Sequence, residues 1–192
     1  SSTDLGFILG PRLNAAGRLD DMSLGIECLL TDDQDLARDM AVQLDQLNHD
    51  RKAIEQGMQR EALERLKDLP LDDLPFGLCL FEPDWHQGVI GILAARLKER
   101  YFRPAIAFAD AGDGLLKGSA RSVPGLHIRD ALDAVAAANP GLISKFGGHA
   151  MAAGLSLAQE NYPAFAAAFD AEVRRQLSAD DLTGRLLSDG QL

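Results

Sequence analysis

The sequence predicts an α/β protein, a small mixed-sheet α/β domain preceded by a long connecting helix. Two observations support this fold class. A long helical periodicity runs from about Asp33 to Lys67, and short apolar runs of strand length then alternate with helical segments over residues 76–178. Alternation of this kind indicates a compact α/β domain with a mixed sheet. At 192 residues, the chain has room for one domain or two small ones.

The long helix is predicted by apolar residues that recur at spacings of three, four or seven, which places them on one helical face. These residues are Leu36, Met40, Leu44, Leu47, Ile54, Met58, Ala62 and Leu66. Roughly 35 residues rising about 1.5 Å each give a helix of about 50 Å, which is longer than a small domain is wide. The pattern fits a solvated helix of a bundle and a connector between two domains equally well.

The remaining elements follow from apolar run length and from glycine and proline as breakers. Residues 10–21 are expected to form a loop rich in glycine and arginine, and residues 68–75 to end the long helix. Asp113 and Gly114 supply a turn, so the strands on either side are expected to pair as a hairpin. The expected helices cover residues 23–30, 88–101, 128–138 and 162–177, the strands cover 77–82, 104–109, 115–122 and 154–157, and residues 182–192 read as a strand cut short.

The charge of −10 is unevenly distributed along the chain. Residues 1–75 hold 16 acidic and 8 basic residues, whereas residues 76–178 hold 10 of each. The second region therefore lacks the broad positive surface of a general nucleic-acid binder, although a few directed cations can still bind phosphate in a pocket. The cations available there are Arg96, Arg103, Lys117, Arg121, Arg129 and Lys145.

The two cysteines and the apolar runs bear on the compartment. Cys28 and Cys79 lie in apolar contexts and are expected to be buried and unpaired. No run approaches the roughly 20 apolar residues of a membrane span, and the first residues have no signal-peptide pattern. The cytoplasm is therefore the expected compartment.

Several chemistries find no support in the sequence. The four histidines have no paired helical spacing, and no cysteine pair suits zinc. There is no P-loop and no serine nucleophile elbow. No acidic cluster indicates a two-metal centre.

The most unusual stretch is KFGGHAMAAG, residues 145–154. Gly147 and Gly148 can bring the backbone close to a ligand, their amides can form an anion-binding nest, and His149 can add a hydrogen bond to phosphate. The alternative is a tight turn in which a backbone carbonyl satisfies His149. The residues alone leave both interpretations open.

Two arginine-bearing stretches are further candidates for phosphate binding. In GSARS, residues 118–122, Arg121 offers a planar fork, and Ser119 or Ser122 can donate to the remaining phosphate oxygens. In GPRLNAAGRL, residues 10–19, the candidates are Arg12, Asn14 and Arg18. Each stretch alone also fits an ordinary solvated loop or strand end.

The segment between the first expected strand and the following helix carries Trp85 and His86. Loops in this position bind ligands in many α/β folds, the helix N-terminus favours anions, and Trp85 can stack on a base. The alternative is a tryptophan that covers the end of the sheet, with His86 capping the helix.

Taken together and in order, five stretches resemble the RecJ-type single-stranded-DNA exonucleases of the DHH phosphoesterase superfamily. They are GPRLNAAGRL, LDQLNHDRKAIEQ, PDWHQGVIGILAARL, GSARSVPGLHIRDAL and KFGGHAMAAGLSL, and the resemblance runs from about Gly6 to Leu187. It covers the C-terminal part of the family's catalytic core. It does not include the Asp-His-His motif or the aspartate motifs that bind metal, so the chain is expected to be a fragment.

The resemblance implies a domain organisation. Residues 1–32 would be the end of the metal-binding DHH domain, 33–75 the connector helix and linker, 76–178 the DHH-associated substrate-binding domain, and 179–192 the start of an oligonucleotide-binding-type domain. The resemblance also implies 5′→3′ hydrolysis of single-stranded DNA in repair and recombination, with Mn²⁺ or Mg²⁺ bound outside this fragment and no metal within it.

The resemblance further implies roles for particular residues. Arg121, Ser122, Gly147, Gly148 and His149 would hold phosphates near the scissile bond, with His149 in an assisting role and no other catalytic residue in the fragment. Trp85 and His86 would line the cleft, and Arg12, Asn14 and Arg18 would lie at the boundary with the metal domain. Single-stranded DNA is the expected ligand, and a single-strand-binding protein and a helicase are expected partners.

Two other functions are compatible with the same features. One is a DHH-superfamily phosphoesterase for short oligonucleotides or phosphonucleotides, and the other is a non-catalytic nucleic-acid-binding module like that of alanyl-tRNA synthetases. The RecJ-like connector disfavours the first. Metal-binding aspartate motifs upstream of Ser1 would disfavour the second.

Overall fold

A computed structural model of the chain describes residues 1–67 and 74–183. Its elements, in chain order, are α1 (Ser2–Asp4), the π-helical turn η1 (Leu5–Leu9), α2 (Gly10–Leu19), α3 (Ser23–Leu30), α4 (Gln34–Leu66), β1 (Leu78–Phe81), α5 (Ile90–Tyr101), β2 (Ala105–Asp110), β3 (Leu115–Arg121), α6 (Ile128–Ala138), β4 (Lys145–Gly148), β5 (Ala152–Ala158), η3 (Gln159–Asn161), α7 (Tyr162–Gln176) and η4 (Ala179–Leu182). The predicted α/β class, with a long helix before a mixed sheet, is confirmed.

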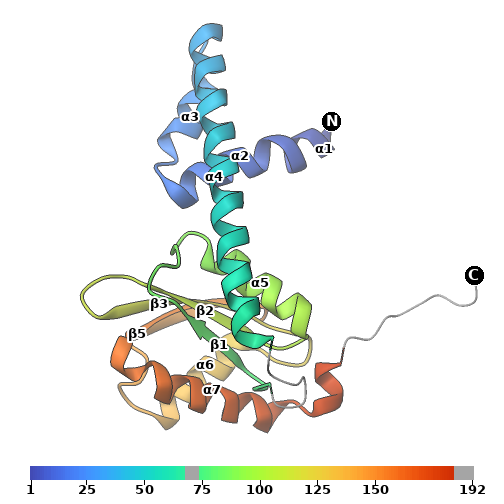
Figure 1. The fold of residues 1–192 in the computed structure, drawn as a ribbon, viewed down its shortest axis with the longest axis vertical. Helices are drawn as coiled ribbons and strands as arrows, with labels where there is room; N and C mark the ends of the chain where they lie inside the picture. The colour runs from blue at the N-terminus through green and yellow to red at the C-terminus, as the bar shows by residue number, and fades with distance from the viewer. Residues whose placement is uncertain (68–73, 184–192) are drawn as a thin grey trace, which may run out of the picture.

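The long helix α4 joins the N-terminal helices to the α/β domain (Figure 1). Asp33 caps its start, because the carboxylate accepts hydrogen bonds from the amides of Asp35 and Leu36 at 2.9 and 3.1 Å. Helices α2 and α3 contact one part of α4, and α5 contacts another. This position is compatible with the connector interpretation, which stays a prediction.

The loop predicted for residues 10–21 is wrong over most of its length, because Gly10–Leu19 form helix α2. Pro11 is compatible with a helix here because it directly follows the π-helical turn η1, in which the Gly10 amide bonds to the Leu5 carbonyl oxygen and the regular i→i−4 pattern that proline would interrupt is already changed. Ala15 and Ala16 are completely buried. Small side chains at these positions let α2 pack closely against α4, and this contact outweighs the low helix propensity of the glycines.

The sheet has the strand order β1-β2-β3-β5-β4, with β1 and β2 parallel and the other pairs antiparallel. The predicted hairpin between β2 and β3 is confirmed. Gly112, Asp113 and Gly114 all have positive φ in its turn, the region that glycine and aspartate tolerate best.

The two faces of the sheet bury different side chains because side chains alternate along a strand. Ile106 and Phe108 of β2 pack with Phe165 and Phe169 of α7 and with residues of α6. The alanines of β2 point to the other face, where they pack with residues of α5 and the end of α4. Helices α6 and α7 therefore cover one face, and α5 lies on the opposite one (Figure 1).

The glycine-rich segment predicted as a loop is mostly strand. Lys145–Gly148 form β4, which pairs with β5, and only residues 149–151 turn between them. Strand β5 begins at Ala152, two residues earlier than predicted. The strand predicted at the end of the chain and the breaker segment after α4 lie largely outside the described residues.

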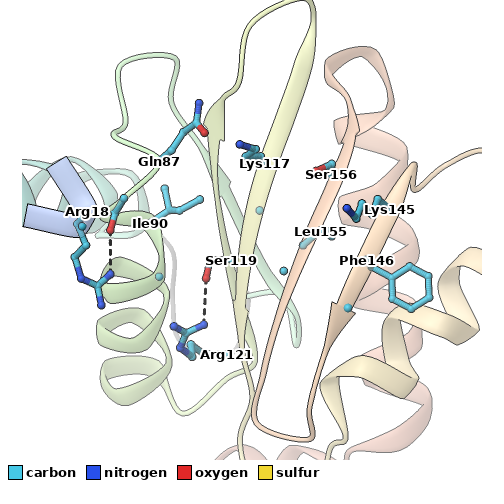
Figure 2. A pocket seen from close by; sticks show the side chains of 16 residues that line it. Arg18, Gln87, Ile90, Lys117, Ser119, Arg121, Lys145, Phe146, Leu155 and Ser156 are labelled. Carbon is cyan, nitrogen blue, oxygen red and sulfur yellow. Dashed lines mark hydrogen bonds between the residues drawn. The ribbon is translucent and has the colours of Figure 1, made fainter. Parts of the chain in front are cut away.

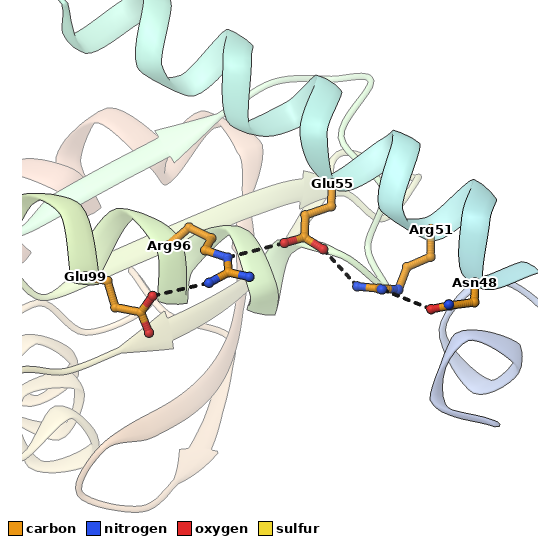
Figure 3. A network of polar contacts seen from close by, with 5 residues as sticks. All are labelled: Asn48, Arg51, Glu55, Arg96 and Glu99. Atoms are coloured by element: carbon orange, nitrogen blue, oxygen red, sulfur yellow. Dashed lines mark hydrogen bonds and ion pairs between the residues drawn. The ribbon is translucent and has the colours of Figure 1, made fainter. Parts of the chain in front are cut away.

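A chain of charged side chains fixes α4 against α5 (Figure 3). Glu55 of α4 accepts hydrogen bonds from Arg51 at 2.8 Å and from Arg96 of α5 at 3.4 Å, and Arg96 also contacts Glu99. Glu55 and Arg51 are largely buried, so their pairing is shielded from solvent. The direction of the connector relative to the sheet is thus set by specific contacts.

The two cysteines are free, but both are only partly buried, so the prediction that they are buried is wrong. Burial, and secondarily the charge of Asp170, raise the pKa of the Cys79 thiol above its usual value, which favours the protonated thiol. Among the helices of residues 1–67 and 74–183, none has the length and apolar composition needed to cross a membrane.

Candidate phosphate-binding site

A cavity of about 750 Å³ lies over the sheet, beside the start of α5. Its floor follows from the alternation of β3, in which Leu116, Gly118 and Ala120 face the core and the residues that alternate with them point to the other face. Lys117, Ser119 and Arg121 therefore share the face that lines the cavity (Figure 2). Strand β3 thus has one apolar face that packs in the core and one polar face that lines the cavity.

The cavity has a strongly one-sided charge. Its lining includes four basic side chains, Arg18, Lys117, Arg121 and Lys145, and no aspartate or glutamate. The other lining residues are Gly17, Gln87, Gly88, Ile90, Gly91, Gly118, Ser119, Phe146, Gly147, Gly154, Leu155 and Ser156. Four cations without a carboxylate among them favour an anionic ligand such as phosphate.

Arg121 is held in place by its own strand. Its Nη1 donates hydrogen bonds to Ser119 Oγ at 3.1 Å and to the Ala120 carbonyl oxygen at 2.8 Å. Partial burial, and secondarily the nearby charge of Arg18, lower the pKa of the Arg121 guanidinium. Arginine nevertheless remains charged at neutral pH, so the site holds a partly desolvated cation whose interaction with an anion is strengthened.

Helix α2 forms one wall of the cavity through Arg18, whose Nη1 donates to the Gly88 carbonyl oxygen at 3.0 Å. A Cβ on Gly88 would lie 2.0 Å from the Arg18 carbonyl oxygen, so only glycine permits this approach. Gly91 has a similar role, since a Cβ there would lie 3.0 Å from Arg121 Nη2 and 3.1 Å from Ser119 Oγ. The first turn of α5 thus lies directly against Arg121. The amides of Ile90, Ile92 and Leu93 in this turn donate to the carbonyl oxygens of His86 and Val89, so the turn contributes mainly the positive end of the helix dipole.

The two glycines of β4 have different surroundings. A Cβ on Gly147 would meet no atom within 4 Å, and this residue lines the cavity. Gly148 has a φ of +150°, and a Cβ there would lie 2.4 Å from the Ala152 carbonyl oxygen. Gly147 therefore leaves room for a ligand, whereas Gly148 is needed for the hairpin itself.

Several predicted site residues lie outside the lining of this cavity. The Ser122 hydroxyl is buried and donates to the Leu126 carbonyl oxygen at 2.8 Å. Trp85 is 3% exposed and donates through Nε1 to Glu61 of α4 at 2.8 Å. The His86 ring accepts a hydrogen bond from the Gly88 amide at 3.1 Å. These contacts match the alternative in which Trp85 covers the sheet end and His86 organises the start of α5.

Three further predicted residues are exposed or paired elsewhere. The side chain of His149 is exposed at the β4–β5 turn, where its backbone amide donates to the Ala152 carbonyl oxygen at 2.8 Å. Arg12 pairs with Asp45 of α4 at 2.7 Å, and Asn14 is exposed on α2. Of the residues predicted to contact substrate, the cavity brings together Arg18, Arg121 and Gly147, and it also includes Ser119, the alternative to Ser122 as a hydroxyl donor.

Ser156 and Gln87 were missed as site residues, whereas Lys117, Ser119 and Lys145 were named as possible phosphate ligands without being placed in one site. The period of β3 predicts that Lys117 and Ser119 share a face with Arg121, so the sequence contained that signal. Ser156 and Lys145 join them only through the pairing of β3 with β5 and of β5 with β4, which no local pattern indicates. Gln87 is placed by a hydrogen bond from its Nε2 to the Asp110 carbonyl oxygen at 2.9 Å.

The residues present do not fit a metal centre. Within residues 1–67 and 74–183, no three or more histidine, cysteine, aspartate or glutamate side chains converge in a way that could hold a metal ion. Divalent cations require oxygen or nitrogen ligands of this kind, whereas this cavity presents cations. The site suits the anionic part of a substrate.

The sequence profile of the DHHA1 domain matches residues 75–175. The chain is 57% identical over its full length to the single-stranded-DNA-specific exonuclease RecJ of Dickeya dadantii, and 56% identical to that of Escherichia coli, in each case over 34% of the relative. It thus spans about a third of the length of the curated relatives it matches. A crystal structure of RecJ from Thermus thermophilus with Mn²⁺ superposes with a TM-score of 0.79 at 32% identity, covering 91% of this chain and 25% of that one. The resemblance to RecJ proteins is therefore confirmed, and the chain belongs to the DHHA1 domain family.

Proposed function

We propose that this chain is the substrate-holding part of a 5′→3′ exonuclease that hydrolyses phosphodiester bonds of single-stranded DNA in repair and recombination. The observation that carries the proposal is the cavity with four cations and no carboxylate in its lining, in a chain whose relatives are named single-stranded-DNA-specific exonucleases. An open cavity on a sheet face can admit a flexible single strand of DNA, and the phosphates of that DNA supply negative charge that the four cations attract.

The proposed phosphate contact nearest the reaction is Arg121, supported by Arg18 and the first turn of α5. Arg121 Nη1 is engaged by its own strand, which orients the planar guanidinium and leaves its other donors for phosphate oxygens. Gly147 lets the ligand approach the backbone of β4. Contact between DNA and the exposed His149 stays a prediction, as do contacts of Ser122, Gly148, Trp85, His86, Arg12 and Asn14.

The hydrolytic step is proposed to need parts of the protein outside this chain. Solved RecJ structures from Thermus thermophilus contain Mn²⁺ or Mg²⁺, so a divalent metal acting in the whole protein fits the family. We propose that residues 1–32 complete the metal-binding domain, residues 33–75 connect, residues 76–178 hold substrate, and residues 179–192 begin a further oligonucleotide-binding domain. The cytoplasmic setting and the partnership with a single-strand-binding protein and a helicase also stay predictions.

The test compares this 192-residue chain with the whole protein on a 5′-labelled single strand in the presence of Mn²⁺. We expect the whole protein to shorten the strand progressively and the isolated chain to leave it intact. Manganese-dependent degradation by the isolated chain would refute the proposal that hydrolysis needs parts of the protein outside this chain. A whole protein that cleaves dinucleotides but not long strands would favour the short-oligonucleotide phosphoesterase instead.

A further inference from the structure

Three polar residues form a row across the sheet at one end of the cavity. Lys117 of β3 is in register with Ser156 of β5, and Ser156 is in register with Lys145 of β4. Residues in register on adjacent strands point to the same face, and all three line the cavity. Because neighbouring strands lie about 4.8 Å apart, the two lysines flank the serine at about 10 Å from each other at Cα.

The row is available for a ligand. Among the described residues, Lys117 and Lys145 form no ion pair, so their charges are not neutralised by a carboxylate of this part of the chain. Both lysine side chains are exposed, and Ser156 is half-buried between them. Two flexible ammonium groups and a hydroxyl between them match the oxygens of one phosphate group.

The row lies too far from Arg121 to share a phosphate with it. Lys117 and Arg121 are four residues apart on one strand, which corresponds to about 13 Å. Figure 2 shows the two groups at opposite ends of the cavity floor. The residues between them on β5 and β4 are Gly154 and Gly147, which are in register with each other and carry no side chain. The floor therefore has two cationic ends separated by an open middle.

We propose that the Lys117–Ser156–Lys145 row is a second phosphate subsite, which binds a phosphate of the same DNA strand at least two nucleotides from the phosphate at Arg121, beyond the reach of the second phosphate of a 5′-phosphorylated dinucleotide. This inference rests on the proposed function, because it assumes that the cavity binds a nucleic-acid strand. The open middle accommodates the sugars and the intervening phosphate between the two bound phosphates. A ligand with phosphate at one end alone cannot occupy both ends, so the row makes the site selective for longer strands.

The experiment measures binding to the whole protein without divalent metal, so that the strand is not cut. The probes are a 5′-phosphorylated single strand of roughly 12 nucleotides and a 5′-phosphorylated dinucleotide. The variant is Lys117→Ala with Lys145→Ala, and its control is Lys52→Ala with Lys98→Ala, which removes the same charge outside the cavity. Thermal unfolding verifies that each variant is folded, which is expected because both lysines of the row are exposed.

We expect the row variant to bind the longer strand about tenfold more weakly, because it lacks two charged hydrogen-bond donors, with little change for the dinucleotide. The dependence of log affinity on log salt concentration should also become shallower, by about 0.7 for each phosphate that the variant no longer neutralises. The control should retain both affinities within about twofold.

Two outcomes would overturn the subsite: a row variant indistinguishable from the control on the longer strand, or an equal weakening on both probes, which would place the row at the first phosphate. Binding of both probes by the Arg121→Ala variant distinguishes failure of the second subsite from failure of the proposed function. If Arg121→Ala weakens binding of both probes and the row variant does not, the second subsite alone fails. If neither variant affects either probe, the cavity does not bind the strand.

Discussion

Replacement of Arg121 by alanine in the whole protein is expected to lower kcat/KM on single-stranded DNA about 100-fold. The guanidinium lies half-buried beside Ser119 and the start of α5, where solvent screens its charge less than at the surface. Its removal takes away a charge-assisted contact to phosphate and leaves that end of the cavity with Arg18 alone as a cation. Steady-state kinetics on a labelled strand measure the effect.

Two further variants test whether the decrease in kcat/KM comes from the loss of the Arg121 guanidinium in particular. Arg121→Lys keeps the charge but removes the planar fork, so an intermediate decrease is expected. Arg129→Ala removes an arginine that is 51% exposed on α6 and contacts Asp130, and its kinetics should remain near wild type. Equal kinetics for Arg121→Ala and Arg129→Ala would remove Arg121 from the substrate site.

Replacement of Gly148 by alanine is expected to lower the free energy of unfolding by about 3 kcal/mol. Its φ of +150° is nearly exclusive to glycine, and the new Cβ would lie 2.4 Å from the Ala152 carbonyl oxygen and 2.5 Å from Ala153 Cα. Both neighbours are backbone atoms, so the clash is relieved only by displacing β4 from β5. Urea unfolding of this chain, followed by far-UV circular dichroism, gives the value.

The adjacent Gly147 provides the matched control. A Cβ there meets no atom within 4 Å, so Gly147→Ala should change stability by less than about 0.5 kcal/mol while placing a methyl group in the cavity. In the whole protein it should weaken DNA binding without unfolding the hairpin. If both alanine variants were equally stable, Gly148 would not be the residue that fixes this hairpin.

The parts of the fold that the sequence predicts well are those with strong local periodicity. Helix α4 carries apolar residues at helical spacing and Asp33 marks its start, although Leu36 is 45% exposed and Asn48 and Glu55 are buried. Strand β2 and helix α6 are similarly clear because breakers flank both. Local pattern and tertiary packing agree at these elements, so the residues of each segment were sufficient to predict it.

Helix α2 and strand β4 show where local patterns fail. Glycines at positions 10 and 17 and Pro11 indicated a loop, but the buried face of Ala15 and Ala16 against α4 stabilises a helix. Strand β4 contains two glycines, which have low strand propensity, and exists because β5 pairs with it. Partners distant in the sequence determine both elements.

The candidate site also contains some residues that local sequence predicts and others that depend on partners distant in the sequence. Arg121 was predicted because serines lie close to it in GSARS and its planar fork suits phosphate, and Arg18 was predicted from the glycine- and arginine-rich stretch GPRLNAAGRL. The row that contains Ser156 needs the registers of three strands, and the burial of Trp85 needs the position of Glu61 on α4. Neither can be obtained from residue types along one segment.

The central claim is that the face of β3, β5 and β4 beside α5 holds the phosphates of the strand. Photocross-linking of an iodouracil-substituted single strand to the whole protein, followed by peptide mapping, tests it most directly. Cross-links are predicted in the peptides that carry β3 and the β4–β5 hairpin, and Arg121→Ala should diminish them. Cross-links confined to α6 and α7, on the opposite face of the sheet, would contradict the account.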